Sequence, residues 1–138
     1  MMRFLLLLLM FAPMFTYGRD RPIHSCEKAP QLAEFQKKLP GYILSSESDV
    51  PTKMISDPKQ LKLFFQPGGL MRRAGSNLTC VVLVVDKEGT VLDAAVSYPA
   101  PLRFTESERK MLLGLRYEPA QIGGKPTPSL ISMDLEFR

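Results

Sequence analysis

The chain contains few of the side chains that enzymes use for metal binding or nucleophilic catalysis. Its 138 residues include one histidine, His24, and two cysteines, Cys26 and Cys80. A metal site needs several ligands at set spacing, and a serine triad needs a histidine beside its nucleophile. The sequence therefore predicts no enzymatic activity, no metal and no cofactor, and His24 is interpreted as a solvated loop residue.

The sequence also lacks the patterns that bind nucleic acids or phosphates. Its aromatic residues are not interleaved with its basic residues, so a base-stacking platform is missing. No helix start follows Gly123-Gly124, which is interpreted as a turn before Pro126. The formal net charge of +4 is a mild excess, which a solvated basic face explains; weak attraction to anionic lipid or polymer is the alternative. We expect no nucleic-acid partner.

No apolar run is long enough for a typical membrane-spanning helix. Such a helix needs roughly 20 residues, and only about 14 apolar positions separate Met1-Met2-Arg3 from Arg19-Asp20-Arg21. A short basic start, an apolar centre and small residues before a cut are typical of a secretion signal. We expect residues 1–18 to be a signal peptide cleaved after Gly18 and the protein to be exported. An uncleaved inner-membrane anchor over residues 4–17 is the alternative.

The two cysteines are predicted to form a disulfide. Thiols oxidise outside the cytosol, and in an exported chain with an even number of cysteines every cysteine can form a disulfide. A Cys26–Cys80 bridge would close a loop of about 55 residues, which stabilises a folded chain by roughly 4 kcal/mol at most in the chain-entropy account. It would tie the N-terminal segment to the first strand of the C-terminal half.

The C-terminal half carries the clearest secondary-structure signals. Residues 78–85 are almost entirely apolar and β-branched, which predicts a strand covered on both faces. Residues 86–89 supply turn chemistry, and residues 91–98 return as the second arm of a hairpin. Pro99 and Pro101 then end the pairing.

A helix and a last strand complete this unit. Thr105 and Glu108 form a capping box and Gly114 is a natural end, so a helix is expected over 106–113. In the last strand, 129–137, apolar and polar side chains alternate, which predicts one buried and one solvated face. These elements predict an α+β fold with a small three-stranded antiparallel sheet and its helices on one face.

The first half of the chain is less regular. Pro30–Leu39 is predicted to form a short helix that Pro40-Gly41 ends, and residues 45–57 are interpreted as a loop. Asp57-Pro58 is a plausible helix start, with a capping residue and then a proline in the first turn. Residues 70–75 are predicted to form a helical turn.

Several short motifs follow one another in a fixed order in the second half of the chain. They are Ala74-Gly75, Asp86–Gly89, the helix at 106–113, Tyr117-Glu118-Pro119-Ala120, Gly124-Lys125-Pro126 and Phe137. In this order they resemble the C-terminal domain of TonB-type energy transducers, a periplasmic module of Gram-negative bacteria. The resemblance implies that fold for a C-terminal domain at 64–138, preceded by an N-terminal extension at 19–63. It also implies a periplasmic location and a partner segment from an outer-membrane transporter.

The chain departs from that family upstream of the domain. Its transducers keep a long anchor helix and cross the periplasm on a proline-rich stretch, whereas residues 19–63 hold only five prolines. Energy coupling is therefore not expected. Loop differences, among them Gly123 where asparagine is common, leave the predicted core intact and bear mainly on the partner.

The predicted functional feature is the edge of the last strand. An exposed edge presents backbone N–H and C=O groups that can pair with an extended peptide. Two alternatives remain open. In the first, the protein is structural and the edge is covered, either in cis, for which Tyr42–Ser45 is suitable, or by a second copy in a homodimer. In the second, the chain is a shortened, membrane-anchored transducer. The residues expected to bind a protein partner by strand addition are Ser129, Leu130, Ile131, Ser132, Met133, Asp134 and Leu135.

Overall fold

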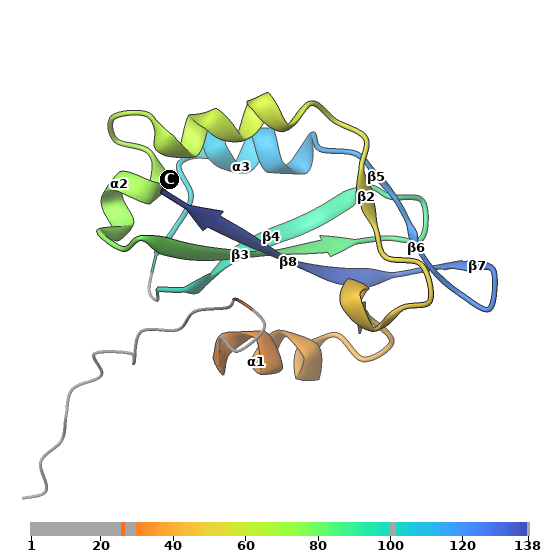
Figure 1. Cartoon of the computed structure of the whole chain (residues 1–138). Helices are drawn as coiled ribbons and strands as arrows, with labels where there is room; N and C mark the ends of the chain where they lie inside the picture. Colours follow the sequence, from red (N-terminus) through yellow and green to blue (C-terminus); the bar gives the residue numbers. More distant parts are fainter. Residues whose placement is uncertain (1–25, 27–29, 100–101, 138) are drawn as a thin grey trace, which may run out of the picture.

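A four-stranded sheet with the order β1-β8-β3-β4 lies at the centre of the protein (Figure 1). The computed structural model describes residues 26, 30–99 and 102–137. The predicted signal peptide, the alternative anchor and His24 lie outside these residues. The strands of the sheet are β1 (Ile43–Leu44), β3 (Leu78–Val85), β4 (Val91–Tyr98) and β8 (Ser129–Glu136).

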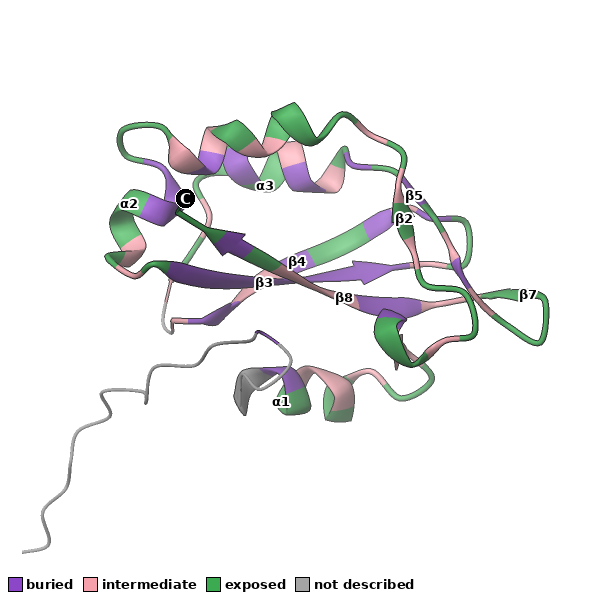
Figure 2. Ribbon diagram, in the orientation of Figure 1, coloured by how far each residue is buried: buried purple, intermediate pink, exposed green. Residues whose placement is uncertain are grey.

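The three long strands form where the sequence predicts them. β3 pairs antiparallel with β4 on one side and with β8 on the other, so it is central. All of its residues are buried, in agreement with its unbroken apolar pattern (Figure 2). The register between β3 and β4 shifts between Cys80 and Val81 and again between Val84 and Val85.

The sheet has four strands rather than the predicted three, because β1 joins it. β1 runs parallel to β8, with Ile43 opposite Ser129 and Leu44 opposite Leu130. Two residues are too few to give a periodic signal in the sequence. The N-terminal extension therefore shares the sheet of the C-terminal domain, and η3 (Pro58–Phe65) runs across the predicted boundary between them.

The larger core lies on the face of the sheet that η3, α2 (Leu70–Ala74) and α3 (Glu106–Leu113) cover (Figure 1). Odd-numbered residues of β3 point into it, since strand side chains alternate between faces. Its buried members include Phe64, Leu70, Val81, Leu83, Val85, Leu112 and Leu115.

The helix α1 (Pro30–Lys38) lies on the opposite face (Figure 1). Its Leu32 is buried in a second cluster with Val82, Val84 and Leu130. The prediction placed the helices of the C-terminal unit on one face, where α2 and α3 do lie, but it did not include α1 of the N-terminal extension, which covers the other face. Even-numbered residues of β3 are as apolar as the odd-numbered ones, and a second layer is needed to remove them from water.

A disulfide between Cys26 and Cys80 ties the N-terminal segment to β3 and confirms the predicted pairing. Both cysteines are fully buried, in a small cluster with Leu78 and Tyr98. The bridge spans 54 positions of the sequence, so it encloses α1, β1 and η3 in one covalent loop.

Residues 45–57, interpreted from the sequence as a loop, contain two short elements. They are η2 (Ser45–Glu47) and β2 (Lys53–Met54). β2 pairs antiparallel with β5 (Tyr117–Glu118). Such short pieces follow tertiary pairing rather than local pattern.

A hairpin of β6 (Ala120–Ile122) and β7 (Lys125–Thr127) projects from one end of the molecule (Figure 1). Gly123 and Gly124 form its turn with positive φ angles, as the sequence predicts. Asp49 holds this turn, since one of its carboxylate oxygens accepts a hydrogen bond from Gly123 N at 2.7 Å.

Glu108 joins two helices below the surface. The predicted capping box of α3 is present, with Thr105 N donating to Glu108 Oε1 at 2.9 Å. The other carboxylate oxygen accepts a hydrogen bond from Leu70 N at 2.8 Å, at the start of α2. Arg73 of α2 pairs with the same carboxylate, and Glu108 is only 1% exposed. α2 and α3 are thereby fixed to each other.

Candidate functional site

The seven residues predicted to bind a partner lie together on β8, but β8 is not an edge strand along its whole length. β1 pairs with it at Ser129 and Leu130. From Ile131 to Met133, β8 pairs with β3 alone among the described strands. β1 falls within Tyr42–Ser45, the segment proposed to cover this edge in cis, and covers its first two positions.

The side chains of β8 alternate between the two cores. Leu130 is fully buried against α1, whereas Ile131 and Met133 pack partly buried against the larger core. Leu135 is buried there too, and Asp134 is exposed. A partner on this strand would therefore meet backbone and the sides of half-buried residues rather than projecting side chains (Figure 2).

A hollow of about 400 Å³ lies beside β8 where its pairing with β1 ends. We call it the β8 groove. β8 contributes Leu130, Ile131 and Ser132 to its lining. Leu44 and Ser46 line the other side, where the chain leaves β1 and enters η2. The groove thus occupies the space in which β1 would continue if it were longer.

The β8 groove is lined by apolar side chains and hydroxyl groups, and no charged residue of the described part of the chain lines it. The rim is fixed in place, because Ser45 Oγ accepts a hydrogen bond from Thr52 N at 2.8 Å. The Oγ atom of Ser132 is buried and has no hydrogen-bond partner among the described residues. Such a groove suits an uncharged, extended segment that carries backbone donors and acceptors.

A second hollow, of about 330 Å³, lies farther along β8. Leu61 and Phe65 of η3 line it together with Leu135 and Glu136. Phe137 closes the end of the strand, since its ring meets that of Phe65 edge-on at 5.6 Å. The two hollows are therefore bordered by different elements along one strand.

Cys26 approaches the strand between the two hollows. Its Sγ atom lies 3.9 Å from the carbonyl oxygen of Met133. A disulfide sulfur carries no proton, so we treat this as a packing contact rather than a hydrogen bond. Described residues of the N-terminal segment thus touch β8 near Ser129 and near Met133.

The sequence reasoning did not identify the opposite edge of the sheet, formed by β4. No other described strand pairs with β4 on its outer side. The signal was present in the predicted topology, because the second arm of a hairpin becomes an edge when the last strand joins the first arm.

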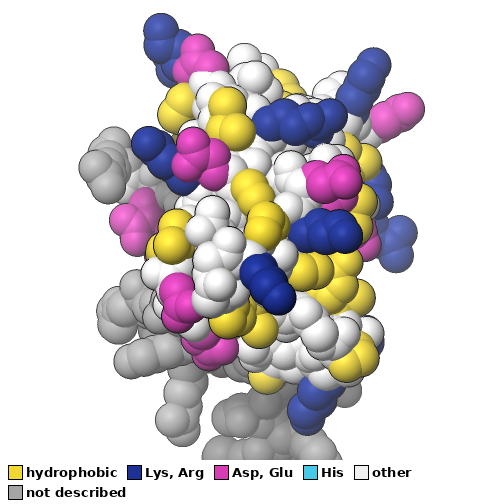
Figure 3. All heavy atoms as spheres, turned by 90° about the vertical axis from the view of Figure 1, so that its right-hand side faces the viewer, with side chains coloured by type: hydrophobic (Ala, Val, Ile, Leu, Met, Phe, Trp, Pro, Cys, Tyr) yellow, Lys and Arg dark blue, Asp and Glu magenta, His cyan; other side chains and the backbone are white. Residues whose placement is uncertain are grey.

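The described residues contain neither a candidate metal site nor a helix suited to span a membrane. No cluster of His, Cys, Asp or Glu among them could hold a metal ion, and no helix among them could cross a membrane. Burial raises the pKa of Tyr117 to about 12, and this residue lies in the larger core, away from the β8 groove. The end of the molecule that carries the β6–β7 hairpin shows apolar, basic and acidic side chains interspersed (Figure 3).

Comparisons with known proteins do not identify a family: no family model matches this chain, and no curated protein matches it.

Proposed function

We propose that this chain is an exported, non-enzymatic protein-binding module that receives an extended segment of a partner in the β8 groove. The observation that carries the proposal is the position of the groove, directly beside Leu130, Ile131 and Ser132 where β1 ends. In strand addition, backbone hydrogen bonds supply affinity and side-chain pockets supply specificity. A visiting segment would extend the line of β1 along β8.

Two further features support export and the class of partner. The buried Cys26–Cys80 disulfide is typical of proteins that fold outside the cytosol. The resemblance to TonB-type C-terminal domains favours a periplasmic location and a segment of an outer-membrane transporter as the partner. Energy coupling is not part of this proposal.

A pair of neighbouring substitutions tests the groove. Ser46 is exposed and lines the groove. A tryptophan side chain at this position would fill the groove and displace a bound peptide. Ser46→Trp should therefore weaken the binding of transporter-derived peptides at least about tenfold. Glu47 is exposed and does not line the groove, so Glu47→Trp is the matched control. Fluorescence anisotropy with labelled peptides measures both. Equal affinities for the two variants would contradict the proposal.

A structural role is the second candidate. It is favoured by β1, which occupies Ser129 and Leu130, and by the disulfide that holds the N-terminal segment against β3. In that case the edge is closed in cis, or by a second copy, and no peptide binds. Light scattering at several concentrations separates the closed monomer from the homodimer.

A shortened, membrane-anchored transducer is the remaining alternative. Its anchor would be residues 4–17, which lie outside the described residues. Mass spectrometry of the mature protein decides the matter, since a chain that starts at Arg19 has lost the anchor.

A further inference from the structure

The outer side of β4 is a second sheet edge, separate from the β8 groove. β4 pairs with β3 on one side only among the described strands. Its Val91 and Ala94 belong to the larger core and its Tyr98 to the cluster around the disulfide, whereas Leu92 remains 51% exposed. An edge of this kind presents backbone groups to which an extended chain can add.

The middle of this edge is occupied by two side chains instead of a strand. Ala94 N donates a hydrogen bond to Asp93 Oδ1 at 2.8 Å, and Ala94 O accepts one from Arg109 Nη1 at 3.4 Å. Both backbone groups of Ala94 therefore point away from β3, as alternate residues of a strand do. Arg109 Nη2 also pairs with Asp93 at 2.9 Å.

This cover is weak. The side chains of Arg109 and Asp93 are 48% and 61% exposed, and ion pairs as exposed as this contribute little to stability. The bond from Arg109 to Ala94 O is also long for a hydrogen bond. A competing carboxylate and a competing backbone could replace both side chains at small cost.

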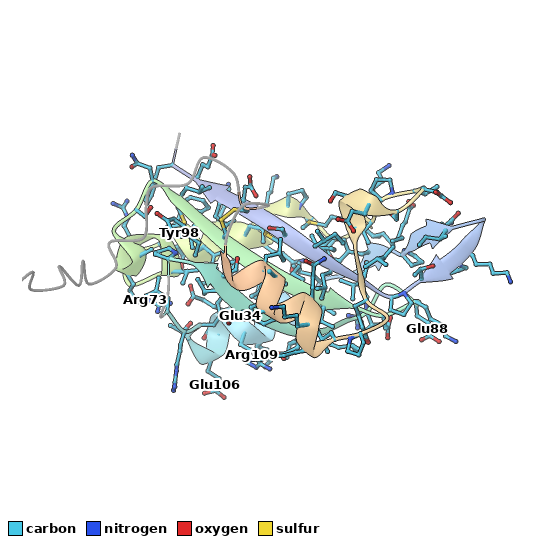
Figure 4. All side chains as sticks on the ribbon, turned by 90° about the horizontal axis from the view of Figure 1, so that it is seen from below. Glu34, Arg73, Glu88, Tyr98, Glu106 and Arg109 are labelled. Atoms are coloured by element: carbon cyan, nitrogen blue, oxygen red, sulfur yellow. A yellow bond between two sulfur atoms is a disulfide. The ribbon has the colours of Figure 1, made fainter. Side chains whose placement is uncertain are left out.

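A hollow of about 310 Å³ lies next to this position. Val96, Leu102 and Phe104 give it apolar walls, and Arg103 and Arg109 stand at its margin. Arg103 makes no side-chain hydrogen bond or ion pair with the residues that the structure describes. Figure 4 shows Arg109 beside the sheet and Glu106 extending away from it. Apolar walls beside two guanidinium groups suit a peptide in which an apolar side chain lies next to an aspartate or glutamate.

We propose that the β4 edge binds an extended segment of a partner protein that carries an aspartate or glutamate beside an apolar residue. The carboxylate of that segment replaces Asp93 on Arg109 and also meets Arg103. Ala94 N–H and C=O are then released to pair with the backbone of the segment. The apolar neighbour fills the hollow between Val96 and Phe104. This site differs from the β8 groove in its strand and in its charge.

The test uses the full mature chain and two synthetic peptides of alternating threonine and valine. One peptide carries a central glutamate and the other a glutamine in its place. The glutamate peptide should bind about tenfold more tightly, the effect of one charge-assisted hydrogen bond. In NMR titrations, the shifted amides should lie at 93–96. Equal affinities, or shifts confined to 131–133, would overturn the proposal.

Substitutions of exposed residues separate this site from the β8 groove. Arg109→Gln should lose the preference for glutamate, and Asp93→Ala should tighten binding several-fold because the internal competitor is gone. Lys110→Gln removes a neighbouring exposed charge that does not line the hollow and should change nothing. Ser46→Trp should leave this binding intact, whichever way the β8 test turns out. A dimer of the chain in light scattering, with the amides at 93–96 protected from exchange in the absence of peptide, would assign the β4 edge to a second copy and overturn the proposal.

Discussion

Glu108 is a buried carboxylate on which two helices depend. Replacing it with alanine leaves the N–H groups of Leu70 and Thr105 without this acceptor and removes the ion pair of Arg73, which keeps its hydrogen bonds to the carbonyl groups of Gly68 and Arg103. Each buried donor without a partner costs about 1–3 kcal/mol. We expect Glu108→Ala to lower the free energy of unfolding by about 3 kcal/mol in urea titrations. Glu106→Ala, on the exposed side of the same helix, should change it by less than about 0.5 kcal/mol.

Tyr117 makes the stability of the protein depend on pH in the alkaline range. Burial raises its pKa from 10.0 to about 12 in the folded state. Below pH 10 the phenol is protonated in both the folded and the unfolded state, and its full contribution to the free energy of unfolding is present. Between pH 10 and 12 the unfolded chain loses this proton first, so stability falls as pH rises.

The expected loss is up to about 2.5 kcal/mol over that interval, from about 1.36 kcal/mol per pKa unit. Tyr117→Phe removes the titrating group and keeps the packing, so its stability should fall less steeply over the same pH range. Urea unfolding at several pH values measures the difference. Parallel curves for the two proteins would show that the phenol of Tyr117 is not shifted.

Gly89 is required by a close approach of two backbones. A Cβ atom at this position would lie 1.8 Å from the carbonyl oxygen of Tyr117, and the residue has a φ of +82°. Gly41 has a similar φ of +92° and open space around it. We expect Gly41→Ala to cost about 1 kcal/mol, from the φ angle alone, and Gly89→Ala about 3 kcal/mol or more. Equal midpoints in thermal unfolding would refute the close approach.

At the scale of the elements, periodic segments could be predicted and short ones could not. β3, β4, α3 and most of β8 carry patterns of several residues, and each forms within a residue or so of the expected bounds. β1 and β2 consist of two residues each, and tertiary pairing alone makes them strands. The segment after Asp57-Pro58 forms a 3-10 helix rather than an α-helix, although Asp57 caps it as expected.

The disulfide is the element-level feature with the largest expected effect on stability. Replacing Cys26 and Cys80 together with alanine should lower the free energy of unfolding by up to about 4 kcal/mol. The reason is that the unfolded chain, without the bridge, regains the conformational entropy of a long loop. A reducing agent should destabilise the parent protein similarly and leave the double variant unchanged. Unfolding of the parent that does not respond to reductant would contradict this role.

At the scale of the whole molecule, the α+β class could be predicted, but the number of layers could not. Residues 78–85 are apolar at every position, which already indicates cover on both faces, whereas the alternation in β8 suggests a single buried face. The structure follows the first pattern: α1 covers the face on which Val82 and Leu130 lie. The alternation in β8 arises because its odd-numbered residues from Ile131 to Leu135 pack on the larger core, whereas Leu130 is its only member of the cluster against α1 among the described residues.

The same arrangement determines what could be predicted of the site. The sequence identified β8 as the strand of interest, and the resemblance to a family directed attention to its edge. The sequence left open that Tyr42–Ser45 covers that edge in cis, and Ile43 and Leu44 do cover its first two positions. It did not indicate that Asp93 and Arg109 would cover the middle of the opposite edge. Both covers depend on contacts between segments distant in sequence, which local patterns do not contain.

Backbone amide exchange along β8 tests the central proposal most directly. The full mature chain is measured alone and with a saturating transporter-derived peptide. Binding in the β8 groove predicts slower exchange at those amides among Ile131, Ser132 and Met133 that point away from β3, because a new strand would protect the outer side of β8. Unchanged exchange at these positions with the peptide present would contradict recruitment at this strand and favour an edge closed by the protein itself.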